Sequence, residues 1–182
     1  MAGSSGDERA WIRGAQRGSA SDLEALFRAH WPLAYRAAHL VVHDTAAAED
    51  IAQESFLAAI RALDRFDRKR PFGPWLHRIV VNRAIDWARA RTLRGEVGDE
   101  YLVESAVGGG GLGRRESAYS EPVVEALAAL SPEHRAVIVL RHLLEYTPGE
   151  IAELLELPRG TVNSRLRRGL DELGEHFGEE RP

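Results

Sequence analysis

The sequence contains no cysteine. This absence excludes disulfide bonds, a zinc site built on thiolates and a catalytic thiol, and any redox sensing must belong to a partner. No apolar stretch approaches the roughly 20 residues that a membrane-spanning helix needs, and residues 1–11 lack the apolar centre of a signal peptide. We therefore expect a cytoplasmic protein without direct membrane insertion.

Motifs of common enzymes are also missing. The 7 histidines are scattered, and there is no HExxH metal spacing, no phosphate-binding loop and no Gly-x-Ser-x-Gly turn. The sequence therefore favours a protein that is not an enzyme, with no metal, no cofactor and no small-molecule substrate.

The net charge of −4 does not suggest a nucleic-acid-binding protein, but the charge is unevenly distributed. Residues 61–94 contain ten Arg or Lys and three acids, a local balance of +7 (10 − 3), and residues 159–168 contain four Arg and no acid. Solvated helix faces often have such compositions. On charge alone, nucleic-acid contact and an ordinary solvated surface remain equally open.

Helical periodicity divides the chain into two parts. Apolar residues spaced three and four apart continue over 21–94, disappear over 95–120, where a glycine-rich run occupies 108–113, and return over 121–177. We predict an all-α protein with an N-terminal helical bundle at 21–94, a flexible linker at 95–120 and a C-terminal helical domain at 121–177. Residues 1–20 and 178–182 are expected to be tails, the first loosely ordered with at most a helical start near Trp11.

In the N-terminal part, Pro32 is expected to kink or divide the first helix. Asp44 is a plausible N-cap for a second helix that runs to about residue 65. The stretch 71–74 opens a third helix that runs to about residue 92.

The second helix has two distinct faces. Its predicted core stripe consists of Ala52, Phe56, Ala59, Ile60 and Leu63. Another face carries acids, an amide and one leucine: Asp50, Gln53, Glu54 and Leu57. This face is typical of a docking surface for a basic protein partner, although a solvated face is the alternative.

The third helix combines aromatic and basic residues. Its apolar side holds Phe72, Trp75, Leu76, Ile79 and Val80, and its polar side holds Arg78, Asn82, Asp86 and Arg89. Such a mixture suits single-stranded DNA, because cations follow the backbone while rings or amides capture unstacked bases. Trp75 and Trp87 fit either this role or the core.

The C-terminal part predicts a helix-turn-helix. Helices are expected at about 121–130, 132–143, 148–155 and 158–177. Thr147, followed by Pro148 and Glu150, predicts a capping box that opens the third of them. On the last helix, an apolar stripe of Val162, Leu166, Leu170 and Leu173 would turn outward Asn163, Ser164, Arg167 and Arg168.

This exposed set can hydrogen-bond base edges and phosphates in a major groove, and the alternative is a solvated helix. Arg135 and Arg141 on the preceding helix could add phosphate contacts or be structural.

Three segments together resemble the extracytoplasmic-function (ECF) sigma factors of bacterial RNA polymerase: AEDIAQESFLAAIRALDRF, PWLHRIVVNRAIDWARAR and LSPEHRAVIVLRHLLEYTPGEIAELLELPRGTVNSRLRRGLDEL. The resemblance covers about 21–94 and 121–174. It implies that two helical domains bind the core RNA polymerase and read the minus-10 and minus-35 elements of promoter DNA, while the linker runs toward the active site. It also implies control by an anti-sigma factor.

The resemblance assigns roles by position. Core-polymerase contacts would fall on the docking face Asp50, Gln53, Glu54 and Leu57. The loop 67–72 would hold a flipped minus-10 base through Asp67, Arg68, Lys69, Arg70 and Phe72, and the melted strand would follow Arg78, Asn82, Arg83, Asp86 and Arg89. The minus-35 duplex would face Arg159, Thr161, Asn163, Ser164, Arg165, Arg167 and Arg168.

Two points remain open in this assignment. The family often has Lys or Arg where this chain has Asn163, so the minus-35 preference is expected to differ. The rival hypothesis is a stand-alone helix-turn-helix regulator, which would bind an operator without polymerase but leaves the acid face and the Asn82 region unexplained.

Overall fold

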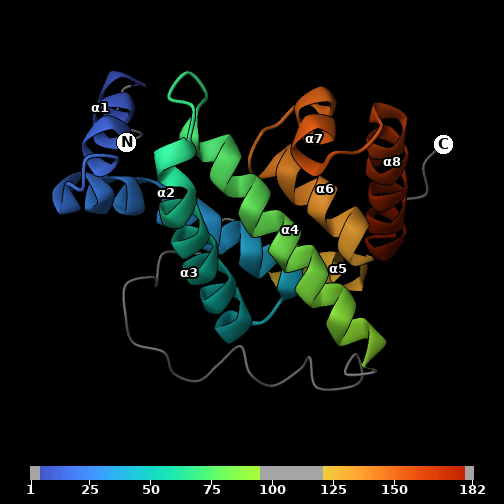
Figure 1. Cartoon of the computed structure of the whole chain (residues 1–182). Coiled ribbons are helices and arrows are strands. Elements are labelled where there is room, and N and C mark those ends of the chain that lie inside the picture. Colours follow the sequence, from blue (N-terminus) through green and yellow to red (C-terminus); the bar gives the residue numbers. More distant parts are fainter. Residues whose placement is uncertain (1–4, 95–120, 179–182) are drawn as a thin grey trace.

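The computed structural model describes residues 5–94 and 121–178, and every regular element in these ranges is a helix (Figure 1). The all-α prediction is confirmed. The elements are α1 (Ser5–Ala15), α2 (Ala20–Val42), α3 (Thr45–Ala62), the short 3₁₀ helix η1 (Leu63–Arg65), α4 (Phe72–Leu93), α5 (Glu121–Ala129), α6 (Pro132–His142), α7 (Pro148–Leu155) and α8 (Arg159–His176).

The boundaries of α3 and α4 follow from local chemistry. The Asp44 carboxylate accepts a hydrogen bond from the backbone N–H of Ala47 at 2.8 Å, which confirms the predicted N-cap of α3. Directly before it, His43 adopts a left-handed conformation (φ 53°) that ends α2. Pro71, with φ −68°, precedes the first turn of α4, as predicted.

The N-terminal segment differs from the expected tail. Residues 5–15 form α1, which packs on α2 and buries Ile12 completely. Gly14 allows this close approach, because a Cβ atom at that position would lie 1.8 Å from Oδ2 of Asp22. In the sequence, the apolar residues at positions 11 and 12 were the only indication of this helix. They could not establish it, because so short a helix gains its stability from packing rather than from its own sequence.

Of the two effects expected of Pro32, a kink or a division, division of the first helix is not observed, because α2 runs through Pro32 as one helix. A proline removes one backbone donor and costs roughly 3 kcal/mol in an isolated helix. Contacts of α2 with α1, α3 and α4 offset that cost, since α2 lies at the centre of the N-terminal domain.

The C-terminal domain contains α5 to α8, with boundaries within two residues of those predicted. The capping box of α7 is present: Glu150 N–H donates to the Thr147 hydroxyl at 3.3 Å, and Thr147 N–H donates to the Glu150 carboxylate at 2.8 Å. The turn into α8 passes through Glu156 in the left-handed conformation (φ 55°). The helix-turn-helix architecture is thereby fixed by caps at both ends of α7.

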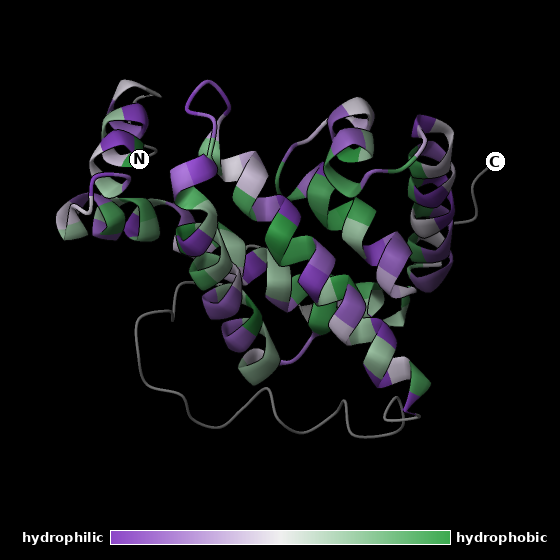
Figure 2. Ribbon diagram, in the orientation of Figure 1, coloured by the Kyte–Doolittle hydropathy of each residue, from purple (hydrophilic) through white to green (hydrophobic). Residues whose placement is uncertain are grey.

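The two domains share one apolar core. Buried apolar residues of α2, α4 and α6 belong to one cluster, and α6 contacts both α2 and α4. Figure 2 shows hydrophobic residues (green) along α4 and α6. Arg135, only 6% exposed, donates to the carbonyl of Val41 in α2 and to those of Ala128 and Leu130 near the end of α5. Of the two roles left open for Arg135, the structural one is therefore the one observed.

The predicted linker at 95–120 lies outside the described residues, as do residues 1–4 and 179–182 of the predicted tails. None of the helices in the described part of the chain combines the length and apolarity needed to cross a membrane.

Candidate nucleic-acid interface

The predicted docking face lies at the surface of α3. Asp50, Gln53 and Glu54 are exposed, and Leu57 retains 50% of its accessible surface. Gln53 donates to Glu49 at 3.2 Å, and Glu54 forms an ion pair with Arg83 of α4 at 2.6 Å. The face therefore presents carboxylates around one exposed leucine.

Ile60 belongs to this surface rather than to the predicted core stripe. It is 38% exposed, whereas Ala52, Phe56, Ala59 and Leu63 of the same stripe are buried. Phe27 of α2, 39% exposed, extends the apolar area, since its ring lies 4.9 Å from that of Phe56. The prediction for Ile60 is wrong because the buried stripe of α3 is narrower than the periodicity suggested.

The loop 67–72 is held in a tight turn by Asp67. Its carboxylate accepts from the N–H of Lys69 at 2.9 Å, and its carbonyl accepts from the N–H of Arg70 at 2.9 Å. Arg68, Lys69 and Arg70 are exposed. The turn thus presents three cationic side chains to solvent.

Phe72, assigned to this loop as a base contact, is instead a core residue. It is 3% exposed, and its ring lies 5.8 Å from Phe66 and 5.5 Å from Trp75. The first residue of α4 faces inward because the helix packs on α2 and α3. Its ring packs in the core next to the loop and is therefore not available to a base.

Residues of α1 and of the turn directly after it contact both ends of the loop. Before the loop, Gln16 Nε2 donates to the carbonyls of Leu63 at 2.8 Å and Phe66 at 3.2 Å. After it, Glu8 Oε1 accepts from the N–H of Phe72 at 3.1 Å. No role was assigned to this segment from the sequence, and helical periodicity could not reveal one, because these contacts join residues 47 to 64 positions apart.

The predicted strand-binding arginines of α4 are paired within the molecule. Arg78 pairs with Glu156, at the turn between α7 and α8, and Arg89 pairs with Glu133 of α6 at 2.5 Å. Arg83 pairs with Glu54, and Arg89 also lies 4.0 Å from Asp86. Asn82 and Asp86 follow Arg78 at four-residue steps on α4, whereas Arg83 is directed toward α3, so the predicted set is divided between two sides of the helix.

Trp75 and Trp87 are both half-buried and pack against the core. Trp75 lies 4.6 Å from the ring of Phe66. The guanidinium carbon of Arg91 lies 5.3 Å above Trp87. Of the two roles left open for these residues, packing is the one that the contacts support.

A buried polar pair joins the two domains. His77 Nδ1 of α4 lies 2.8 Å from the Tyr146 hydroxyl, just before α7. Burial, with a smaller contribution from the nearby His30, lowers the pKa of His77 to about 4. Burial also raises the pKa of Tyr146, so both partners are neutral at pH 7.

The helix α8 exposes most of the predicted minus-35 set. Arg159, Asn163, Arg167 and Arg168 are exposed, and Thr161, Ser164 and Arg165 are half-buried. Val162 and Leu166 are buried as predicted, but Leu170 is 39% exposed. Gly169 is buried in its place, because a Cβ atom there would lie 3.2 Å from Cγ1 of Ile138 in α6. The prediction of Leu170 as a core residue is wrong.

Among the described residues, two further kinds of site are relevant: a phosphate contact at Arg141 and a metal site built on His, Asp or Glu. Arg141 donates to the carbonyl of Tyr146 at 3.3 Å, a local structural contact. Within residues 5–94 and 121–178, no three His, Asp or Glu side chains are grouped as metal ligands.

Comparisons with known proteins match the two domains separately. The family described as Sigma-70 region 2 matches residues 26–94, and the family described as Sigma-70, region 4 matches residues 120–173. The ECF RNA polymerase sigma factor SigW of Bacillus subtilis is 33% identical over 154 residues, covering 76% of this chain and 80% of SigW. The ECF RNA polymerase sigma factor SigL of Mycobacterium tuberculosis is 33% identical over 180 residues, covering 90% and 97%.

Solved structures agree with these relatives. The structure of CnrH in complex with the cytosolic domain of CnrY matches with a TM-score of 0.69 and 26% identity over 96% of this chain and 99% of that one. The sigma factor RpoE of Bartonella quintana, solved with the anti-sigma factor NepR, shares the fold with a TM-score of 0.67 and 23% identity over 88% and 99%. The chain therefore belongs to the ECF family of RNA polymerase sigma factors, is not an enzyme, and directs promoter recognition by the polymerase.

Proposed function

We propose that this sigma factor uses three separate surfaces, each for one ligand. The docking face of α3 binds the core polymerase, the loop 67–72 with the polar side of α4 binds the melted minus-10 strand, and α8 binds the minus-35 duplex. The observation that carries this division is the distribution of charge. Acids surround Leu57 on α3, whereas α8 exposes arginines with no acid over 159–168, and the two helices lie on opposite sides of α4 (Figure 1).

The docking face suits a basic protein surface. Exposed carboxylates provide charge complementarity, and Phe27, Leu57 and Ile60 provide apolar area at its centre. Interfaces of this composition gain specificity from charge and affinity from the apolar contacts.

The minus-10 surface requires a rearrangement. Arg78 and Arg89 are paired with Glu156 and Glu133 of the C-terminal domain, so these arginines must exchange carboxylates for phosphates when DNA binds. Both are exposed pairs, worth about 0–1 kcal/mol each, which a polyanion can displace.

A cytoplasmic anti-sigma protein is the expected regulator. CnrH, which this chain resembles in fold and sequence, was solved with the cytosolic domain of CnrY. The exposed apolar residues Phe27, Leu57 and Ile60 offer such a partner a surface that polymerase also needs, so the two would compete.

Run-off transcription tests the proposal. Core polymerase is incubated with a fragmented bacterial genomic library, with and without this protein. New discrete transcripts that share two upstream motifs establish the promoter specificity. If no transcript appears while the protein alone binds duplex DNA tightly, the stand-alone regulator is the better description.

A further inference from the structure

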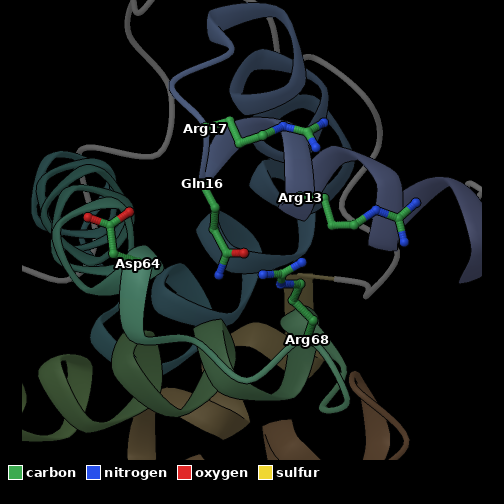
Figure 3. Close-up of a pocket in the computed structure, with 5 residues that line it drawn as sticks. All are labelled: Arg13, Gln16, Arg17, Asp64 and Arg68. Carbon is green, nitrogen blue, oxygen red and sulfur yellow. The ribbon is translucent and has the colours of Figure 1, made fainter.

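Three arginines line a pocket between the α1 region and the loop 67–72, which is the loop proposed to hold a minus-10 base. The pocket has a volume of about 430 Å³ and is lined by Arg13, Gln16, Arg17, Asp64 and Arg68. In Figure 3 the Arg68 side chain extends from the loop toward Gln16 and Arg13, and Asp64 stands on the opposite side. Arg13 lies in α1 and Arg17 in the turn directly after it, and in Figure 3 their side chains extend in the same direction.

These arginines differ from the paired arginines of α2 and α4. Arg28, Arg78, Arg83 and Arg89 each form an ion pair with a glutamate. Within the part of the chain that the structure describes, Arg13, Arg17 and Arg68 form no ion pair, although all three are exposed or half-buried. The pocket is therefore lined by three cations and one acid, and its net positive charge favours an anion.

The pocket is also rigidly placed. Gln16, which directly follows α1, donates hydrogen bonds to the carbonyls of Leu63 and Phe66, and Glu8 of α1 accepts one from the backbone N–H of Phe72. The segment 8–17, which supplies Arg13 and Arg17, is therefore fixed to both ends of the loop that supplies Arg68. An anion bound here would lie beside the exposed turn of Lys69 and Arg70.

We propose that this pocket binds a backbone phosphate of the single-stranded minus-10 DNA, next to the base that the loop holds. The inference rests on the proposed function and gives α1 a role that helical periodicity could not indicate. Guanidinium groups bind phosphate oxygens through paired hydrogen bonds, and three of them can share one phosphate or two consecutive ones. A DNA strand is favoured over a small free anion because the basic residues continue from the pocket along the loop.

The test uses holoenzyme and a fluorescent promoter fragment, chosen from the run-off assay, that is unpaired over the minus-10 element. The variant Arg13→Ala/Arg17→Ala is compared with the unmodified protein, and Arg28→Ala is the matched control, since it removes an equal type of charge from a distant exposed pair. We expect the double variant to bind about tenfold more weakly at low salt. The slope of log affinity against log salt should become shallower by roughly 0.7 for each phosphate that the variant no longer binds.

The pattern of the weakening identifies a phosphate contact. Because phosphates carry no sequence information, the variant must weaken all selected promoters equally. A weakening that depends on promoter sequence, or an unchanged salt slope, would overturn the inference. Unchanged affinity in a holoenzyme that still initiates would overturn it while leaving the proposed function intact, whereas failure of the unmodified protein to initiate at all would refute the proposed function.

Two further measurements separate the remaining outcomes. Calorimetric titration of the free factor with pyrophosphate tests whether the pocket binds a small anion instead. The DNA assignment is overturned if the unmodified protein binds pyrophosphate tightly, the double variant does not, and promoter binding is the same for both. If the double variant fails to fold, as judged by its circular dichroism and core binding, Arg13→Gln and Arg17→Gln are measured singly, and the same salt-slope criterion applies to each.

Discussion

At the residue scale, the surface carboxylates of α3 are the clearest target. We expect Asp50→Lys/Glu54→Lys to lower core-polymerase binding by more than tenfold, because like charges placed against a basic partner cost several kcal/mol. The fold should survive, since both residues are exposed and the Glu54–Arg83 pair is worth about 0–1 kcal/mol. A pull-down with core polymerase measures the effect, with Glu153→Lys/Glu175→Lys as the control. Normal binding by the α3 variant would refute the docking face.

A second prediction at this scale concerns α8. Asn163 and Arg167 are exposed on the same face, one turn apart. Replacing either by Ala should remove about 1–3 kcal/mol of discrimination at one minus-35 position. Transcription from a library randomised over that element measures the preference, and core binding should not change. Identical promoter selection by both variants and the parent would exclude these residues from base contact.

At the scale of elements, Arg135 joins three parts of the fold. Its guanidinium serves carbonyls in α2 and near the end of α5 while its own helix, α6, packs on α2 and α4. Arg135→Ala would leave these acceptors without that donor, and we expect the free energy of unfolding to fall by about 2–4 kcal/mol. Urea denaturation measures it. Arg141→Ala, an exposed neighbour with one weak contact, should change stability by less than about 0.5 kcal/mol.

Local signals predicted most elements well. Asp44 and Thr147 cap their helices in the folded chain as the sequence indicated, because capping depends on residues three positions apart. The predictions that were wrong concerned features that depend on contacts between residues far apart in the sequence. The packing of α1 rests on Gln16 and Glu8 reaching residues far along the chain, and Pro32 is accommodated by surrounding helices.

The candidate site was predictable to a similar extent. Exposure of Asp50, Glu54, Asn163 and Arg167 follows from helical period alone. Burial of Phe72 does not, since the sequence cannot show which side of the first turn of α4 meets the core. The ion pairs of Arg78 and Arg89 with acids of the other domain could not be predicted either, because no sequence pattern specifies how two helical domains pack against each other.

At the scale of the whole molecule, the contact between domains covers part of the proposed minus-10 surface. Glu133→Gln/Glu156→Gln would release Arg89 and Arg78 without changing side-chain size. We expect the variant factor alone to bind a single-stranded minus-10 oligonucleotide several-fold more tightly, as measured by fluorescence anisotropy. Glu24→Gln, which releases Arg28 far from this surface, is the control. Equal affinities would show that these pairs do not compete with DNA.

The same contact should respond to pH through His77. Its pKa falls from 6.5 to about 4 in the folded protein, where it faces the Tyr146 hydroxyl and lies near His30. Below pH 6.5 the unfolded chain binds the proton more readily, so stability is present above that pH and declines as pH falls toward 4. The decline attributable to His77 should reach about 3 kcal/mol.

Denaturation curves of the parent and His77→Asn at several pH values isolate this contribution from that of His43, whose pKa is also lowered, to about 3. Asparagine offers Tyr146 a polar partner that does not titrate over this range. The variant should therefore lose less stability than the parent between pH 6.5 and 4. Parallel curves would mean that His77 is not the group responsible.

The Arg83–Glu54 pair has one more consequence, because it connects the face proposed for polymerase with the face proposed for DNA. If polymerase binds Glu54 first, Arg83 is released for DNA, and if DNA binds Arg83 first, Glu54 is released for polymerase. Thermodynamic reciprocity then requires that polymerase and promoter each strengthen the binding of the other by the same factor. Since an exposed pair is worth at most about 1 kcal/mol, that cooperativity is limited to roughly fivefold, enough to favour the ternary complex over either binary one.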